Sequence, residues 1–145
     1  MKSLHVEASG VARTEPEAVW ALVADATSYS SWGPWSDSGY DDAGLAQTVG
    51  TKRWMRYGRT LTRERITELE APRRLGYTVI GGLPVRGYRS TVTLTPAEGG
   101  TRIDWQADWE PTLLGRLVHR KLRGFYPAML QDLIAAAESS AGVRR

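Results

Sequence analysis

The chain has no cysteine and only two histidines among its 145 residues. Without cysteine, it can form neither a disulfide framework nor a thiolate nucleophile. The two histidines, His5 and His119, lie far apart in the sequence, so the residue types that commonly bind zinc are not grouped. We therefore predict a protein that holds no metal.

Long apolar segments are also missing. No stretch approaches the ~20 apolar residues that a membrane-spanning helix needs. The first residues, Met1 to Glu7, are not followed by the apolar region of a secretory signal, so we expect a cytoplasmic protein. The net charge of +3 is modest and no basic motif typical of nucleic-acid binding is present, so no nucleic-acid partner is expected.

Common catalytic motifs are absent as well. There is no Gly-x-Ser-x-Gly elbow and no glycine-rich phosphate loop, and no cofactor is predicted. Tryptophan and tyrosine are abundant instead, with six of each against one phenylalanine. Both combine a large apolar face with a hydrogen-bonding tip, which suits the wall of a pocket for a partly polar ligand. Ordinary core packing is the alternative interpretation.

Hydrophobic periodicity predicts one domain, residues 1–145, in which several strands precede a long helix. Residues alternate between apolar and polar over Leu4–Ala12 and most clearly over Thr101–Trp109. Further strands are predicted at residues 50–57, 60–69, 75–80 and 88–95. From about Pro111 to Ser139 apolar residues recur at helical spacing, beginning with Leu113, Leu114 and Leu117.

Local signals predict how the helices begin and end. Thr14 is placed to cap a first helix, with Glu17 completing a capping box. A short helical turn follows at residues 27–32. In the long helix, Pro127 lacks an N–H and crowds the preceding turn, so we expect a kink or break there. The tail, residues 142–145, is expected to fray.

Several short motifs resemble those of a known superfamily over nearly the whole chain. They are residues 14–20, 25–32, 64–66, 72–75 and 99–101, followed by the terminal helix. Together with the order of elements, they resemble the START-like superfamily, especially its polyketide cyclase/dehydrase and lipid transport branch. The resemblance implies an α+β helix-grip fold, with two short helices after the first strand and a curved antiparallel sheet wrapped around the C-terminal helix.

The resemblance also implies a cavity between sheet and helix. Such a cavity would hold a small hydrophobic or amphipathic molecule, either lipid-like or polyketide-like. Because the branch contains carriers and enzymes, a polyketide cyclase/dehydratase that acts on a chain held there is the second hypothesis. A third is an accessory protein that works through protein contacts.

The strand at residues 60–69 carries the candidate charged groups. Alternation puts Arg63 and Arg65 on one face and Glu64 and Ile66 on the other, but it does not say which face points inward. In aromatase/cyclase relatives an inward arginine near this point is thought to steady an enolate. The resemblance therefore makes Arg65 the catalytic candidate, with Glu64 as a ligand contact. Cross-strand pairing on a solvated face is the alternative.

Aromatic residues supply the other candidates. In the superfamily an aromatic residue at the position of Tyr77 lines the pocket, and its hydroxyl could bond a ligand carbonyl or act as a weak acid. Trp32, beside Trp35, is a candidate lid. The remaining predicted pocket residues are Trp54, Tyr57, Tyr88, Trp105, Trp109, Leu130, Leu133 and Ile134.

A basic group lies toward the start of the predicted long helix, where the helix dipole disfavours positive charge. Its members are Arg116, Arg120, Lys121 and Arg123. They indicate an acidic partner, either an acyl carrier protein or a membrane surface, unless they form a simple solvated face. His119 lies among them and is interpreted as a surface histidine, with a general base as the alternative.

Overall fold

The computed structural model describes residues 2–41 and 48–140 of the chain. Within these residues, seven strands form one antiparallel sheet in the order β1-β7-β6-β5-β4-β3-β2. The strands are β1 (Leu4–Ala12), β2 (Asp37–Tyr40), β3 (Lys52–Tyr57), β4 (Thr60–Glu70), β5 (Arg74–Gly81), β6 (Arg89–Ala97) and β7 (Gly100–Trp109). The helices are α1 (Pro16–Val23), a 3₁₀ turn η1 (Ala26–Ser28), α2 (Tyr29–Trp32) and α3 (Leu113–Ser140).

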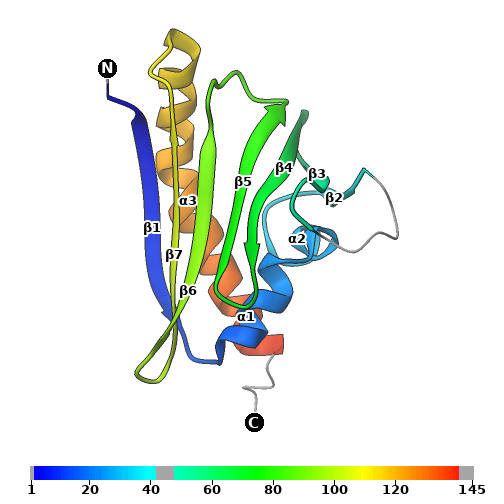
Figure 1. Ribbon diagram of the computed structural model, residues 1–145, viewed down its shortest axis with the longest axis vertical. Helices are drawn as coiled ribbons and strands as arrows, with labels where there is room; N and C mark the ends of the chain where they lie inside the picture. Colours follow the sequence, from blue (N-terminus) through cyan, green and yellow to red (C-terminus); the bar gives the residue numbers. More distant parts are fainter. Residues whose placement is uncertain (1, 42–47, 141–145) are drawn as a thin grey trace.

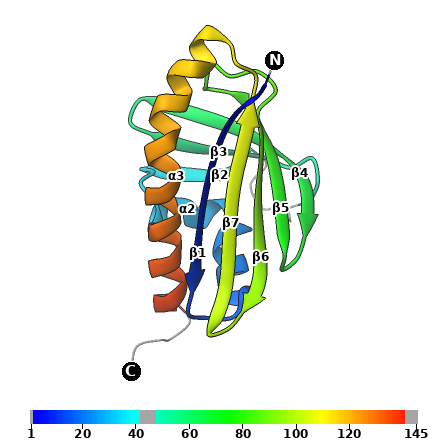
Figure 2. The same cartoon turned by 90° about the vertical axis from the view of Figure 1, so that its left-hand side faces the viewer.

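The sheet curves around α3, which lies along one face of it, while α1 and α2 lie on the same side (Figures 1 and 2). This arrangement confirms the predicted α+β helix-grip fold. The face of α3 toward the sheet is apolar at helical spacing, so its burial holds the two layers together. Its buried residues are Gly115, Val118, Tyr126, Met129, Leu130, Leu133 and Ala137.

The predicted cap of α1 is wrong, and the predicted break in α3 is absent. Residue Glu15, not Thr14, is the N-cap of α1, and its side chain makes no capping hydrogen bond. The Thr14 carbonyl instead accepts a hydrogen bond from Oγ1 of Thr101 on β7, at 2.7 Å. The long helix α3 also runs unbroken through Pro127. Pro127 lies on the exposed side of α3, where water can bond the carbonyl that the missing N–H would have served. The predicted fraying at 142–145 lies outside the described residues.

The first turn of α3 departs from the expected apolar stripe. Leu113 is 79% exposed, and Leu114 and Leu117 are each 53% exposed. Figure 1 places this turn at the end of the molecule where β1 begins and β7 ends. Helical spacing identified these leucines as apolar positions, but the sheet does not reach far enough to cover them. Within the described residues, no helix is long and apolar enough to cross a membrane.

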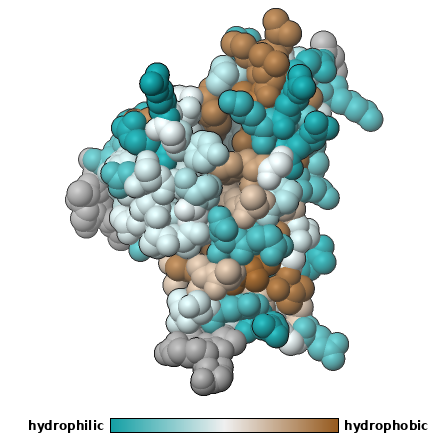
Figure 3. Space-filling view, turned by 180° about the vertical axis from the view of Figure 1, so that it is seen from behind, coloured by the Kyte–Doolittle hydropathy of each residue, from teal (hydrophilic) through white to brown (hydrophobic). Residues whose placement is uncertain are grey.

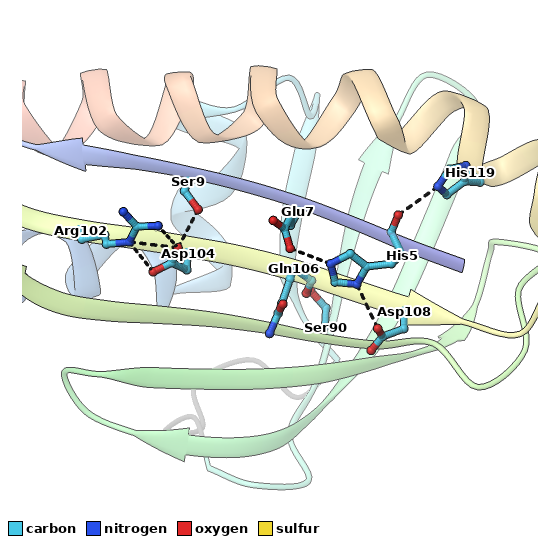
Figure 4. A network of polar contacts seen from close by, with 9 residues as sticks. All are labelled: His5, Glu7, Ser9, Ser90, Arg102, Asp104, Gln106, Asp108 and His119. Carbon is cyan, nitrogen blue, oxygen red and sulfur yellow. Dashed lines mark hydrogen bonds and ion pairs between the residues drawn. The ribbon is translucent and has the colours of Figure 1, made fainter. Parts of the chain in front are cut away.

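Polar side chains cover the outer face of β1 and β7, opposite the face that grips α3 (Figure 4). Ser9 donates to Asp104 at 2.6 Å, and both ring nitrogens of His5 meet carboxylates, Glu7 at 2.8 Å and Asp108 at 3.1 Å. This confirms the predicted alternation of a buried and a solvated face. On α3, His119 contacts the backbone of β1: its Nε2 lies 3.0 Å from the carbonyl oxygen of His5.

We predict a pH dependence of stability from His5. Hydrogen bonds to Glu7, then to Asp108, raise the pKa of His5 above its ordinary 6.5, because both ring nitrogens can donate only when the ring is protonated. The stabilisation is therefore complete below pH 6.5 and lost as pH rises through the raised pKa. The ring is 42% exposed, so the effect should stay below about 1 kcal/mol. Thermal melts at pH 5 to 9 should show this step in the wild type and not in His5→Gln; identical profiles would contradict it.

A second prediction concerns the grip between α3 and the sheet. Leu133 is fully buried, so Leu133→Ala should lower the free energy of unfolding by about 2–5 kcal/mol, because it leaves a cavity between the layers. Leu113→Ala on the same helix is the matched control and should change it by less than about 0.5 kcal/mol. Urea unfolding measures both, and equal effects would mean that α3 does not pack as described.

Candidate functional site

A buried ion pair lies inside the grip. On β3, Arg53 and Met55 point inward and Trp54 points outward, as strand alternation requires. The Arg53 side chain is completely buried, and Glu64 lies directly opposite it on β4. Nε of Arg53 donates to Oε1 of Glu64 at 2.9 Å. The sheet therefore carries a charged pair on its inner face.

Two tyrosines pack against the Arg53 guanidinium. Its central carbon lies 5.0 Å from the ring centroid of Tyr29 on α2 and 4.7 Å from that of Tyr77 on β5. Both distances allow an attraction between the cation and the ring faces. Nη1 also donates to the Tyr29 hydroxyl at 3.3 Å. Nη2 is buried and has no hydrogen-bond partner among the described residues.

A group of buried hydroxyls extends the polar interior toward α3. Tyr88, just before β6, shares a short hydrogen bond with Tyr126 of α3. The Tyr126 hydroxyl also lies 3.2 Å from Oγ of Ser90. On the sheet, Nε1 of Trp105 donates to the Tyr77 hydroxyl at 3.2 Å. Hydroxyls from the sheet and α3 thus meet inside the grip, close to the Arg53 pair.

Burial sets the protonation of these groups. It raises the pKa of Tyr77, Tyr88 and Tyr126 well above their ordinary 10.0, so these hydroxyls stay neutral donors rather than bases. Burial also raises the pKa of Glu64, against the opposing charge of Arg53. For Arg53, burial acts to lower the pKa, but Tyr29 and Glu64 outweigh it and the guanidinium remains charged. The interior therefore presents a fixed positive charge beside neutral hydroxyls.

Aromatic side chains from three elements close one side of this interior. Trp35 packs on Trp32 with ring centroids 5.5 Å apart and on Phe125 of α3 at 5.8 Å. Tyr57 completes the row, 5.4 Å from Phe125. Gly33 is needed here, because a Cβ at this position would lie 2.2 Å from the Trp35 indole. Two of the hollows that the described residues line have volumes of about 220 and 440 Å³, and neither of these two includes the Arg53 pair or the buried tyrosines among its lining.

Residues 3–138 match the model of the family described as "Polyketide cyclase / dehydrase and lipid transport". The chain belongs to this family. The match confirms the predicted resemblance. No curated protein matched the chain.

Solved structures share the family's fold. XoxI from Bacillus cereus is 21% identical, with a TM-score of 0.77 over 94% of this chain and 97% of that one. StfQ, described as a di-domain ARO/CYC from the steffimycin biosynthetic pathway, is 15% identical with a TM-score of 0.75, over 97% of this chain and 52% of its own. The Aha1 dimer from Colwellia psychrerythraea is 18% identical, with a TM-score of 0.68 over 92% of this chain and 96% of that one. At these identities the likeness shows the fold alone.

Several residues predicted for the family's pocket do lie in the interior. Glu64 and Tyr77 meet at Arg53, and the others are packed around them or on α3. The buried members of the predicted set are Glu64, Tyr77, Tyr88, Trp105, Trp109, Leu130 and Leu133. Whether any of them contacts a ligand stays a prediction.

The placement predicted for Arg65 is wrong. Its side chain is exposed, because β4 points Glu64 and Ile66 inward and Arg65 therefore outward. It cannot reach a molecule held between the sheet and α3. Arg63 also stays outside, in an ion pair with Asp41. The inward arginine of this chain is Arg53, on the neighbouring strand.

Four other predicted pocket residues lie at the edges. Trp54 is on the outer side of β3 against Gly39, and Tyr57 is 52% exposed. Ile134 is half-buried and faces Gly10 of β1, where a Cβ would lie 2.9 Å from its Cδ1. Trp32 belongs to the aromatic row described above, and its role as a lid stays a prediction.

Sequence reasoning missed Arg53, Tyr29 and Tyr126, although one signal was available for Arg53. The Gly58–Arg59 turn fixes the β3–β4 register, so that Tyr57 pairs with Thr60 and Arg53 with Glu64. A cation and an anion opposite each other, next to inward Met55 and Ile66, mark a buried pair. No comparable signal identifies Tyr29 or Tyr126.

We predict that Arg53→Met lowers the free energy of unfolding by about 3–5 kcal/mol, because it leaves the Glu64 carboxyl buried without its partner. Arg53→Met with Glu64→Leu should recover most of that loss, since the double variant leaves no unpaired charge. Urea unfolding of the two variants is the measurement. If the double variant were as unstable as the single one, the pair would not be buried as described.

Proposed function

We propose that the protein binds a small amphipathic molecule between the sheet and α3, with an oxygen of that molecule accepting a hydrogen bond from Nη2 of Arg53. The observation that carries the proposal is this buried donor, which lacks a partner among the described residues. An unsatisfied buried donor costs about 1–3 kcal/mol, and more when it is charged. A ligand oxygen would remove that cost.

The surroundings of Arg53 suit the rest of such a molecule. Aromatic faces and aliphatic side chains of α3 offer apolar contact, whereas the hydroxyls of Tyr77 and Tyr126 offer a few fixed polar groups. Small-molecule sites commonly combine mostly apolar walls with few polar groups in this way. The family's description, which includes lipid transport, supports a ligand of this kind.

Entry would require side chains to move. The interior tyrosines contact one another, and the two hollows described above lie elsewhere. The row formed by Trp32, Trp35 and Phe125 closes the interior with half-buried rings, which lose less contact on moving than fully buried ones. We therefore place the entrance at this row.

The second candidate function is a polyketide cyclase/dehydratase. It is favoured by the permanent charge of Arg53, which lies against the ring of Tyr77, together with the Tyr77 hydroxyl, which burial keeps neutral. Preorganised donors of this kind stabilise the negative charge that develops on an enolate oxygen. A carrier uses Arg53 in ground-state binding, whereas a cyclase also needs it for turnover.

The experiment compares two probes of similar shape, 2-acetylnaphthalene and 2-isopropylnaphthalene, in which a methyl group of the second takes the place of the acceptor oxygen of the first. Arg53→Met with Glu64→Leu should weaken binding of the ketone by about 10- to 100-fold, the worth of a hydrogen bond to a charged group. Binding of the hydrocarbon should stay within about 3-fold of wild type. Quenching of tryptophan emission reports binding of each.

The controls separate ligand binding, which the carrier and cyclase hypotheses share, from a role through protein contacts. Arg65→Met removes an outward charge and should leave both affinities unchanged. Native mass spectrometry of freshly purified protein should also detect a bound molecule that carries oxygen. If neither probe binds and nothing co-purifies, the proposed site is wrong and a role through protein contacts remains.

A further inference from the structure

The start of α3 combines exposed leucines with unpaired positive charge. The large apolar side chains that are exposed within residues 2–41 and 48–140 include Leu113, Leu114 and Leu117, three within one turn and a half of helix. Scattered single apolar residues are normal on a surface, but a contiguous group indicates a contact site. Figure 3 shows this hydrophobic group at one end of the molecule, with hydrophilic side chains beside it.

The charges around these leucines have one sign. Arg116, Arg120, Lys121 and Arg123 are all exposed, and the first acidic residue of α3 is Asp132. None of the four is in an ion pair within the described part of the chain. The nearby carboxyl of Glu110 packs over Gly87 instead, 3.2 Å from where a Cβ would lie. The helix dipole adds no compensation, since it disfavours cations at this end.

The positions on α3 place the two kinds of side chain together. At 100° per residue, Leu113, Leu117, Arg120 and Lys121 fall on one exposed side, with Leu117 between the two cations. A hollow of about 440 Å³ lies next to the leucines, between residues 112–114 and residues 84–86 of the β5–β6 connection. Arg86 adds another cation to its rim.

We propose that this end of α3 binds the surface of an anionic lipid bilayer. Aliphatic side chains that enter the headgroup boundary, with lysine and arginine at the level of the phosphates, are the arrangement of interfacial helices. Protein interfaces instead concentrate tryptophan, tyrosine and arginine at their centres and use leucine sparingly. The three leucines therefore favour lipid over an acidic protein such as an acyl carrier protein. The proposal does not depend on the interior site.

Vesicle sedimentation tests the proposal with the full chain. Vesicles of phosphatidylcholine alone are compared with vesicles containing 30% phosphatidylglycerol, at about 0.1 M salt. We expect at least about 10-fold tighter binding to the anionic vesicles, weakening as salt rises.

Three double variants separate the contributions. Leu113→Ser with Leu117→Ser should weaken binding to anionic vesicles by at least about 10-fold, because two apolar side chains no longer enter the boundary. Arg120→Gln with Lys121→Gln should weaken it by about 5-fold per charge. The matched control is Arg13→Gln with Arg102→Gln, which removes the same charge at the end of the sheet where β1 ends and β7 begins, far from the start of α3, and should cost less than about 3-fold.

Several outcomes would overturn the proposal. Equal binding to neutral and anionic vesicles would show that the cations of α3 do not recognise anionic lipid. Binding of the leucine variant at the wild-type level would show that the leucines do not enter the bilayer and that only charge attraction remains. If the control variant lost as much affinity for anionic vesicles as the basic variant, the position of the charges on α3 would not matter. Binding to a purified acidic carrier protein without binding to vesicles would assign the surface to protein instead. Thermal melts of each variant, expected to match the wild type, exclude misfolding as the cause.

Discussion

The ion pair between Arg53 and Glu64 joins the two strands on which the interior depends. It occupies directly opposed positions on β3 and β4, and the guanidinium in turn contacts Tyr29 of α2 and Tyr77 of β5. One charged group therefore organises three strands and a helix. Removing two charges from water costs free energy that their attraction regains only when further contacts help, and similar pairs can often be replaced by apolar residues without loss. Stability alone is thus a weak reason for the pair, and a ligand contact at Nη2 is the reason we propose.

The helix α3 serves the fold and the proposed contacts with different parts of its length. From Tyr126 to Ala137 one face of the helix is buried against the sheet, and its start carries exposed leucines and cations. One helix thus packs against the sheet along most of its length and presents an exposed surface at its start. A protein that carries an apolar molecule and also touches a bilayer would have both functions on one helix.

The fold could be predicted because its signals are local and repeated. Alternation in β1 and β7, turns rich in glycine and helical spacing in α3 each specify an element, and the resemblance supplied their order. The end of the apolar stripe could not be predicted, because spacing identifies Leu113 and Leu114 as apolar without saying where the sheet stops. The predicted Thr14 cap is wrong because α1 begins one residue later, after the Glu15 N-cap, and no local motif reveals the hydrogen bond from Thr101 that the Thr14 carbonyl accepts.

The site was harder to predict because the face of each strand had to be assigned. Placing Arg65 inward assigns the wrong face of β4 to the interior, because a shift of one residue exchanges the two faces of a strand. The general rule that arginine lies at the surface hid Arg53, although the Gly58–Arg59 turn pairs it with Glu64. Contacts such as Tyr88 with Tyr126 join residues far apart in the chain and depend on how α3 docks.

The most direct test of the account is the ¹⁵N NMR spectrum of the Arg53 guanidinium, measured with and without 2-acetylnaphthalene. If a ligand oxygen accepts from Nη2, the ketone should shift the Nη2 signals and slow their exchange with water, and 2-isopropylnaphthalene should leave them nearly unchanged. Arg53 signals that remain constant while the ketone binds elsewhere would contradict the central claim.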